Sequence, residues 1–305
     1  MRSDQTGIAI SHCPICDRDL RPDATFCDAC GARRSHATDS SPQGDCTVIL
    51  TFDLDGPSAT ISQNPKVERR PSTLSLGEYG PAVATPLILD LLAAHDIPAS
   101  FYIPGWVAER HPALVRRIAA AGHEIGHHGY LHEPPASLSR DEEAAVLDKA
   151  AAILRPLAGT APRGYRSPAW ELSEHSLTLL RDRNFLYDSS LMGDDRPYAL
   201  GNGLVEIPVH WALDDYPYFN FSALDTRRLP ASPAHVLDTW AAAFEELHAR
   251  RALFVLTTHP SIIGRPGRLR LLERLIQHIR TFPNVRFARA IDVAQQLARS
   301  QPASG

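Results

Sequence analysis

The chain has 305 residues, of which 44% are hydrophobic and 22% are charged, and its formal net charge is −4. This is the composition of a globular protein with one large domain or two smaller ones. The mild negative charge disfavours nucleic acid and anionic membrane surfaces as partners, because both usually bind proteins with a positively charged surface. No apolar run approaches the roughly 20 residues that span a bilayer, and no secretory signal precedes the first cysteines, so we expect a cytoplasmic protein.

Four cysteines near the amino end are arranged as two pairs, with two residues inside each pair and ten between the pairs. They are Cys13, Cys16, Cys27 and Cys30. Four thiolates at this spacing can hold one tetrahedral structural zinc ion, and a segment this short lacks the core to fold without a cross-link. Two disulfides are the alternative, which a reducing cytoplasm disfavours. The stretch resembles a zinc ribbon, including the second knuckle "FCDACG".

The domain prediction places this zinc ribbon at residues 1–34 and a linker at 35–46, where Ser, Asp, Pro and Gly occur without apolar period. A second, larger domain is predicted at 47–298, followed by a tail at 299–305.

Within that domain, segments typical of strands alternate with segments typical of helices. The strand candidates are 46–52, 99–105, 123–125, 185–190, 204–209, 252–259 and 285–289, and the helix candidates include 85–95, 111–122, 139–157, 236–247 and 271–279. A loop rich in Pro, Ser and Gly is predicted at 56–84. Thr85 suits the N-cap of the helix after it, and Ser139 with Glu142 forms a capping box. This alternation predicts an α/β fold with a parallel (β/α) barrel.

Ionisable residues follow several of the predicted strands, at the edge where the βα loops of a barrel converge. Asp53 and Asp55 end the first strand, His128 and His132 follow the third, and His259 ends a later one. One carboxylate and two imidazoles can bind a divalent metal ion and leave positions open for water and substrate. A second carboxylate could then act as a base, and the last histidine could protonate a leaving nitrogen.

Taken singly, an aspartate at a strand end is usually a turn former and a lone histidine is usually a surface group. Their joint occurrence at strand ends favours a catalytic site for metal-assisted amide hydrolysis.

The motifs resemble those of the polysaccharide deacetylase, or NodB-homology, superfamily of carbohydrate esterase family four, over about residues 47–298. The matching stretches are "TFDLDG", "HHGYLH", "RSPAW", "YDSSL" and "LTTHP". The resemblance implies a distorted (β/α) barrel of the NodB type. It also implies Asp53 as catalytic base, Asp55, His128 and His132 as metal ligands, and His259 as proton donor. Arg166 would orient the base, Pro168 and Trp170 would line the substrate groove, and Asp188 would help position the acid.

Some positions depart from the usual family pattern. Gly129 replaces a Ser or Thr, His127 stands where Asn is common, and the tryptophan that usually follows Asp188 is missing. The sequence is similar instead to the branch that holds cytoplasmic-type peptidoglycan deacetylases, cyclic imidases and allantoinase-like proteins. All three metal-ligand positions are filled, so zinc or a related divalent ion is expected. The role of His127 stays open.

The substrate is a small molecule or an oligosaccharide, and two classes are open. The resemblance to the superfamily favours N-deacetylation of an N-acetylated sugar, whereas the resemblance to the branch also implies hydrolysis of a small cyclic imide or ureide. Trp211, in "WALDDYPYF", either walls the substrate pocket or packs in a core or subunit interface.

A third hypothesis is an inactive barrel that carries a partner-binding zinc ribbon, but the complete set of catalytic residue types disfavours it. Homo-oligomerisation and a docking partner for the ribbon stay open.

Overall fold

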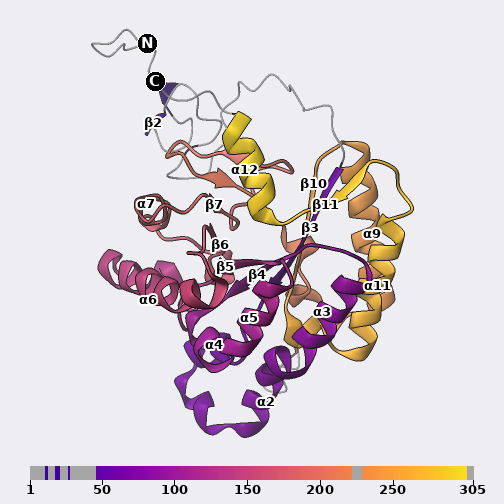
Figure 1. Ribbon diagram of the computed structural model, residues 1–305, viewed down its shortest axis with the longest axis horizontal. Helices are drawn as coiled ribbons and strands as arrows, with labels where there is room; N and C mark the ends of the chain where they lie inside the picture. The colour runs from indigo at the N-terminus through magenta and orange to yellow at the C-terminus, as the bar shows by residue number, and fades with distance from the viewer. Residues whose placement is uncertain (1–10, 13–17, 21–26, 28–45, 222–228, 301–305) are drawn as a thin grey trace.

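The structure is a computed structural model that describes residues 11–12, 18–20, 27, 46–221 and 229–300. Its central element is a nine-stranded sheet with the order β10-β3-β4-β5-β6-β7-β9-β8, in which β11 also pairs with β3 (Figure 1). The strands are β3 (Cys46–Asp53), β4 (Ser100–Ile103), β5 (Glu124–His127), β6 (Gly164–Tyr165), β7 (Tyr187–Asp188), β8 (Tyr198–Ala199), β9 (Val205–Glu206), β10 (Leu253–Thr258) and β11 (Val285–Phe287). All of the predicted strands are therefore present.

The strand pairings are parallel except for β8 with β9, so the sheet is mixed rather than wholly parallel as predicted. In the described part of the chain, no ladder joins the two end strands β10 and β8. The segment after β9 lies between the two sides of the sheet: Val209 N–H donates to Leu191 O at 3.0 Å, and Asp215 N–H donates to Thr257 O at 3.2 Å. This segment brings its side chains to the carboxyl end of β10.

Strand β3 has three neighbours in the sheet. Its first residues pair with β11, its last residues pair with β4, and β10 runs along most of its other side. All but one of its residues are buried, as expected for a parallel strand that is covered on both faces.

Helices lie around this sheet (Figure 1). They are α1 (Ser58–Gln63), α2 (Pro71–Tyr79), α3 (Thr85–Ala94), α4 (Gly105–Arg110), α5 (Pro112–Ala120), α6 (Arg140–Ala158), α7 (Ser176–Asp182), α8 (Tyr216–Phe219), α9 (Pro233–Ala249), α10 (Pro260–Ile263), α11 (Pro266–Ile279) and α12 (Ala290–Ser300). Several of them, among them α3, α5, α9 and α11, bury apolar side chains in the largest core cluster of the sheet. The predicted capping box of α6 is confirmed, since Ser139 Oγ accepts from Glu142 N–H and Glu142 accepts from Ser139 N–H. No helix in the described residues is long and apolar enough to cross a membrane.

The prediction of a loop at 56–84 is wrong. That region contains α1, a 3₁₀ helix (Pro65–Arg69), α2 and a π-helical turn (Gly80–Ala84) that continues into α3. Thr85 is therefore inside a continuous helical run, and its hydroxyl donates to Gly80 O at 2.9 Å instead of capping a helix end.

The zinc-ribbon prediction falls largely outside the described residues, which do not include Cys13, Cys16 or Cys30. Two short strands, β1 (Ser11–His12) and β2 (Asp19–Leu20), pair antiparallel there, and Cys27 is buried. The predicted linker and tail also lie almost wholly outside the described ranges, so the predicted domain boundaries stay predictions.

Candidate active site

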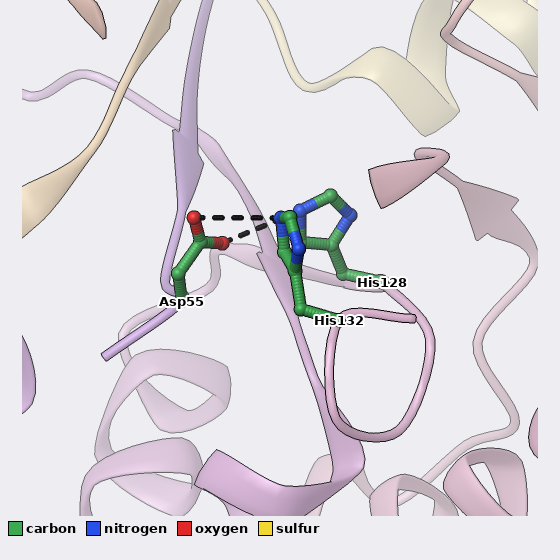
Figure 2. A group of neighbouring side chains, drawn as sticks. All are labelled: Asp55, His128 and His132. Carbon is green, nitrogen blue, oxygen red and sulfur yellow. Dashed lines mark ion pairs between the residues drawn. The ribbon is translucent and has the colours of Figure 1, made fainter. Parts of the chain in front are cut away.

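Three predicted metal ligands meet at the carboxyl ends of β3 and β5. Asp55 lies in the turn after β3, His128 directly follows β5, and His132 lies in the loop after it. Figure 2 shows the carboxylate of Asp55 facing both imidazoles. His128 Nε2 lies 3.3 Å from Asp55 Oδ1, and His132 Nε2 lies 3.6 Å from Asp55 Oδ2. The chain therefore brings together the three side chains that the sequence assigned to one ion.

The tight loop between the two histidines explains how both can reach one carboxylate. Gly129 has φ 70° and His132 has φ 61°, so two residues adopt the left-handed backbone region. The carboxylate of Glu133 accepts hydrogen bonds from Tyr130 N–H at 3.1 Å and Leu131 N–H at 2.8 Å. Glycine at position 129 suits this turn, because its positive φ strains residues that carry a Cβ.

The donor set fits a divalent metal ion. One ligand atom from each of Asp55, His128 and His132 lies within 4.8 Å of the others. Asp55 Oδ1 is buried and has no hydrogen-bond partner, although buried polar atoms normally have one. His128 Nδ1 lies 2.7 Å from Arg166 O, so this nitrogen donates to the carbonyl and leaves Nε2 with its lone pair toward Asp55. Two imidazoles and one carboxylate suit zinc and related ions.

Electrostatics keeps Asp55 and His132 in forms that a metal ion can bind. At His128 burial opposes protonation, but the neighbouring carboxylates outweigh it and raise the pKa, so a bound ion would have to displace a proton there. Burial lowers the pKa of His132 to about 4, so this imidazole is neutral at neutral pH. Burial disfavours the ionised form of Asp55, but the facing imidazoles outweigh that effect and hold its pKa well below the usual range. A neutral imidazole and an ionised carboxylate are the ligand forms that metal binding requires.

Asp53, the predicted base, is held by Arg166. Its carboxylate accepts from Arg166 Nη1, with distances of 3.1 Å to Oδ1 and 3.3 Å to Oδ2. The same guanidinium donates to Thr257 Oγ1 at 3.0 Å and to Ser189 Oγ at 2.9 Å, and Arg166 is fully buried. Asp53 Oδ2 lies 4.0 Å from His128 Nε2. Arg166 therefore holds Asp53 beside the predicted metal ligands, which is the position that the predicted role of Arg166 requires.

His259, the predicted proton donor, lies directly after β10 and faces the same point from the other side. Its Nε2 lies 3.8 Å from Asp55 Oδ2. Its Nδ1 lies 2.7 Å from Asp215 Oδ1 and 3.7 Å from Asp214 Oδ1. Burial opposes protonation of His259, but these carboxylates outweigh it and raise its pKa well above the usual value. At neutral pH the imidazole therefore carries the proton that a general acid must give.

Asp188, by contrast, does not have the expected partner. Its carboxylate accepts from Ser190 Oγ at 2.9 Å and interacts with the carboxyl group of Glu206, and burial raises the pKa of both acids. The carboxylate that bonds to His259 is Asp215, so the expectation that Asp188 helps position the acid is corrected. Asp188 instead belongs to the buried polar contacts around the residues that follow β7.

Asp214, Asp215 and Glu206 were not assigned by sequence reasoning. The adjacent aspartates in "WALDDYPYF" are the available signal for the first two, in a stretch that the sequence places either in a pocket wall or in a core or subunit interface. Asp214 forms an isolated parallel bridge with Thr257, which places both aspartates beside the end of β10.

The residues predicted to line the substrate groove form an aromatic pair. The rings of Trp170 and Trp211 stack with centroids 4.2 Å apart and planes inclined by 26°. Trp170 is buried, whereas Trp211 is 42% exposed. Pro168 begins the 3₁₀ turn that carries Trp170, and the ring of Tyr216 lies 5.6 Å from that of His259. An exposed aromatic surface therefore adjoins the charged groups.

His123 and His127, the other two histidines of the motif, are structural. His127 Nδ1 accepts from Gly129 N–H at 3.2 Å, so its Nε2 carries the proton and donates to Leu147 O at 3.1 Å. Burial lowers its pKa to about 4, which keeps the ring neutral. His123 Nδ1 accepts from Ala99 N–H at 3.2 Å. The sequence leaves the role of His127 open, and these hydrogen bonds show that it fixes the backbone between β5 and the loop that carries His132.

Comparisons with known proteins agree with this fold. A family model described as polysaccharide deacetylase matches residues 40–187. A peptidoglycan deacetylase of Helicobacter pylori is 31% identical over 265 residues, which cover 77% of this chain and 90% of that protein.

Two solved structures extend the likeness over most of the chain. A protein described as a putative polysaccharide deacetylase, from Mycobacterium smegmatis, has a TM-score of 0.82 and 37% identity, covering 93% of this chain and 97% of its own. The crystal structure of Puue allantoinase has a TM-score of 0.73 and 25% identity, covering 87% and 94% respectively. On the identity and coverage of these relatives, and on the motifs that the fold brings together, the chain belongs to the polysaccharide deacetylase family.

Proposed function

We propose that the protein is a metal-dependent hydrolase that removes the acetyl group from the nitrogen of an N-acetylated sugar. The observation that carries this proposal is the meeting of Asp55, His128 and His132 with Asp53 on one side and His259 on the other. A ligand group, a base and a protonated acid around one point are the equipment for hydrolysis of an amide.

Each residue has a separate task in this chemistry. Asp55, His128 and His132 would hold the ion, which when bound supplies a Lewis acid that polarises a carbonyl group and makes water acidic near neutral pH. Asp53, oriented by Arg166, accepts the proton from the attacking water. His259 gives its proton to the amide nitrogen as the carbon–nitrogen bond breaks, so acetate and a free amine leave.

A sugar substrate is supported by two observations. The relative from Helicobacter pylori is named a peptidoglycan deacetylase. The exposed ring of Trp211, stacked on Trp170, offers an apolar face next to the charged groups, which suits the apolar face of a pyranose ring. Zinc is the ion that we propose, because two imidazoles and one carboxylate form a typical catalytic zinc set.

A cyclic imide or ureide is the second candidate substrate, and the likeness to Puue allantoinase favours it. Both candidates place a carbon–nitrogen bond over the same residues. Assays for acetate released from N-acetylglucosamine oligomers and for ring opening of small cyclic imides separate them, because each measures a different product.

Asp53→Asn tests the assigned chemistry. The variant keeps the size of the side chain and all three ligands, so we expect wild-type metal content and a loss of turnover of at least about 100-fold, in the range for removing a general base. Metal content is measured by mass spectrometry and turnover by acetate release. Wild-type turnover in this variant would refute the assigned base.

The amino-terminal cysteines are proposed to hold a separate structural zinc ion, in a ribbon that docks an unidentified partner, and the protein is proposed to act in the cytoplasm. Wild type should then contain two zinc ions per chain. The double variant His128→Ala, His132→Ala should contain one, and so should a variant in which Cys13 and Cys16 are both serine. One ion in wild type that survives loss of both histidines would argue against the catalytic metal.

A further inference from the structure

Two tyrosines inside the barrel form a hydrogen-bonded column beneath Arg166. Tyr102 in β4 and Tyr187 in β7 are fully buried, and their hydroxyl oxygens lie 2.9 Å apart. Tyr187 donates its single hydroxyl proton to Glu124 Oε1 at 2.7 Å, so Tyr102 must be the donor to Tyr187. Burial raises the pKa of both phenols, which keeps both protons in place. The column therefore has one defined direction of hydrogen bonding.

The lower end of the column is anchored at Glu124. Its Oε2 accepts from Ser100 Oγ at 2.6 Å and from Ile291 N–H at 2.9 Å. Ser100 Oγ in turn accepts from Ala290 N–H at 2.9 Å. Because Ala290 and Ile291 open α12, the column joins strands β4, β5 and β7 to the first turn of the last helix. The bonds among Tyr102, Tyr187, Glu124 and Ser100 are buried, in an interior where an unpaired polar group would be costly, and the bond from Ile291 N–H is partly buried.

Glycines in the neighbouring strands make room for both rings. A Cβ at Gly126 in β5 would lie 2.4 Å from Tyr102 Cδ1, and a Cβ at Gly164 in β6 would lie 2.1 Å from the hydroxyl oxygen of Tyr187. No side chain larger than hydrogen fits at either position unless the rings move. The rings are therefore held laterally by close packing and along the column by hydrogen bonds, so that little freedom is left to them.

At the upper end, the ring of Tyr102 supports the catalytic arginine. The guanidinium carbon of Arg166 lies 4.4 Å from the centroid of this ring. The two terminal nitrogens of Arg166 donate to Asp53, Thr257 and Ser189, whereas its Nε is buried without a hydrogen-bond partner. The side of the guanidinium that carries Nε is therefore restrained by contacts with aromatic rings and not by hydrogen bonds.

We propose that Tyr102 is a positioning residue that holds the guanidinium of Arg166 against the base Asp53, and that Tyr187 and Glu124 fix the Tyr102 ring for this task. The inference rests on the proposed function, because it acts through the base of that reaction. None of the three residues is one of the predicted metal ligands. The column should therefore change the rate of the chemical step and leave metal binding and substrate affinity unchanged.

Packing alone is the competing explanation, since both rings also belong to an apolar cluster with Ile49 and Val255. Packing predicts that removal of the Tyr102 ring lowers stability and leaves turnover per folded molecule unchanged. Positioning predicts a fall in kcat at constant KM and constant zinc content, with rescue by any residue that restores the ring.

The experiment compares Tyr102→Leu, Tyr102→Phe and the control Phe244→Leu in the zinc-loaded full chain. Phe244 is fully buried in a different part of the core and has no role in the site. We expect kcat to fall about 30-fold in Tyr102→Leu, as loss of a desolvated cation–π contact implies. In Tyr102→Phe, which keeps the ring and loses one hydrogen bond, it should fall only about threefold. The control should keep its kcat despite a similar loss of stability.

A second readout does not require turnover. Because the guanidinium lies over the Tyr102 ring, the ring should shift the NMR signal of the Arg166 Nε–H, which can be assigned with Arg166→Lys. Tyr102→Phe should keep the shift, whereas Tyr102→Leu should move the signal toward the value of an unstacked arginine. If wild type hydrolyses none of the tested substrates, the proposed function fails, and this signal still decides whether the ring holds the arginine.

Tyr187→Phe tests the column if Tyr102→Leu does not fold, because it breaks two hydrogen bonds and keeps both rings. It should lower kcat about fivefold at constant KM, since a small misplacement of a catalytic group is costly. Wild-type kcat in Tyr102→Leu, or in Tyr187→Phe where the first variant is unfolded, would overturn the proposal. An unchanged Arg166 signal in Tyr102→Leu would do the same.

Discussion

The contact between His259 and Asp215 leads to a prediction with a defined size. Asp215→Asn removes the negative charge 2.7 Å from His259 Nδ1 and keeps an oxygen that can accept from His259 N–H, now at 3.1 Å. At an effective dielectric constant of about 20, the lost attraction is about 6 kcal/mol before desolvation is subtracted. Net values for such charge-assisted hydrogen bonds are about 2 kcal/mol, which corresponds to about 30-fold in kcat.

The pH dependence gives the prediction a sign. Carboxylates raise the pKa of His259, and His259 must be protonated to act as the acid. Loss of the Asp215 charge lowers this pKa, so the alkaline limb of the kcat/KM profile should move to lower pH in the variant. Acetate release between pH 5 and pH 10, at equal zinc content, measures both the limb and the plateau.

Asp214→Asn is the matched control. This carboxylate lies farther from His259 Nδ1, at 3.7 Å, and also accepts from Tyr216 N–H at 2.6 Å. Burial raises the pKa of both aspartates, but Asp215 also hydrogen-bonds to His259 Nδ1 at 2.7 Å. Loss of Asp214 removes a nearby charge and leaves that hydrogen bond in place, so it should shift the profile less than the loss of Asp215. Equal shifts in the two variants, or an unshifted limb in Asp215→Asn, would refute this assignment of the acid's partner.

Two further predictions concern stability and are measured by urea unfolding. Gly164→Ala should lower the free energy of unfolding by about 1–3 kcal/mol, because the new Cβ would overlap Tyr187. The control Gly267→Ala should not be destabilised, because no atom lies within 4 Å of a Cβ built there. Equal losses in the two variants would contradict the predicted clash. Burial raises the pKa of both Asp188 and Glu206, so the folded chain retains a proton that the unfolded chain releases above about pH 4, and the free energy of unfolding falls as pH rises. Glu206→Gln should reduce this fall between pH 5 and pH 8, and an unchanged slope would show that the pair does not titrate.

Side chains at strand ends could be predicted from the sequence because parallel strands place their carboxyl ends at one edge. Asp53, Asp55, His128 and His259 all follow apolar runs that are easily recognised as strands, and the structure brings their side chains within a few ångströms. For these residues, recognition of a strand end in the sequence is enough to locate the side chain in the fold, because the strand ends meet at one edge of the sheet.

The partner of His259 could not be predicted in the same way. Asp215 follows no strand of its own, and its position depends on the single bridge between Asp214 and Thr257. Such a bridge leaves no period in the sequence, because only one residue pair takes part in it. The resemblance pointed instead to Asp188, whose carboxylate is committed to Ser190 and Glu206.

The helical region at 56–84 was missed for a related reason. Pro65, Pro71 and Pro81 suggested a loop, yet each occupies the first turn of a helical segment, where a missing N–H costs nothing. No residue of α2 is buried, so the apolar period that identifies a helix is absent from this stretch. Composition alone could not separate a loop from short helices joined end to end.

Two adjacent histidines at the end of β5 have different roles because their side chains point in different directions. His127 and His128 are adjacent, and because successive side chains leave a strand on opposite faces, only one of them can face the metal ligands. His127 uses both ring nitrogens on the backbone of Gly129 and Leu147, and so has no lone pair left for an ion. His128 uses one nitrogen on Arg166 O and presents the other to Asp55. The same carbonyl belongs to the residue whose guanidinium holds Asp53, so Arg166 contacts the proposed metal ligand His128 through its backbone and the proposed base Asp53 through its side chain.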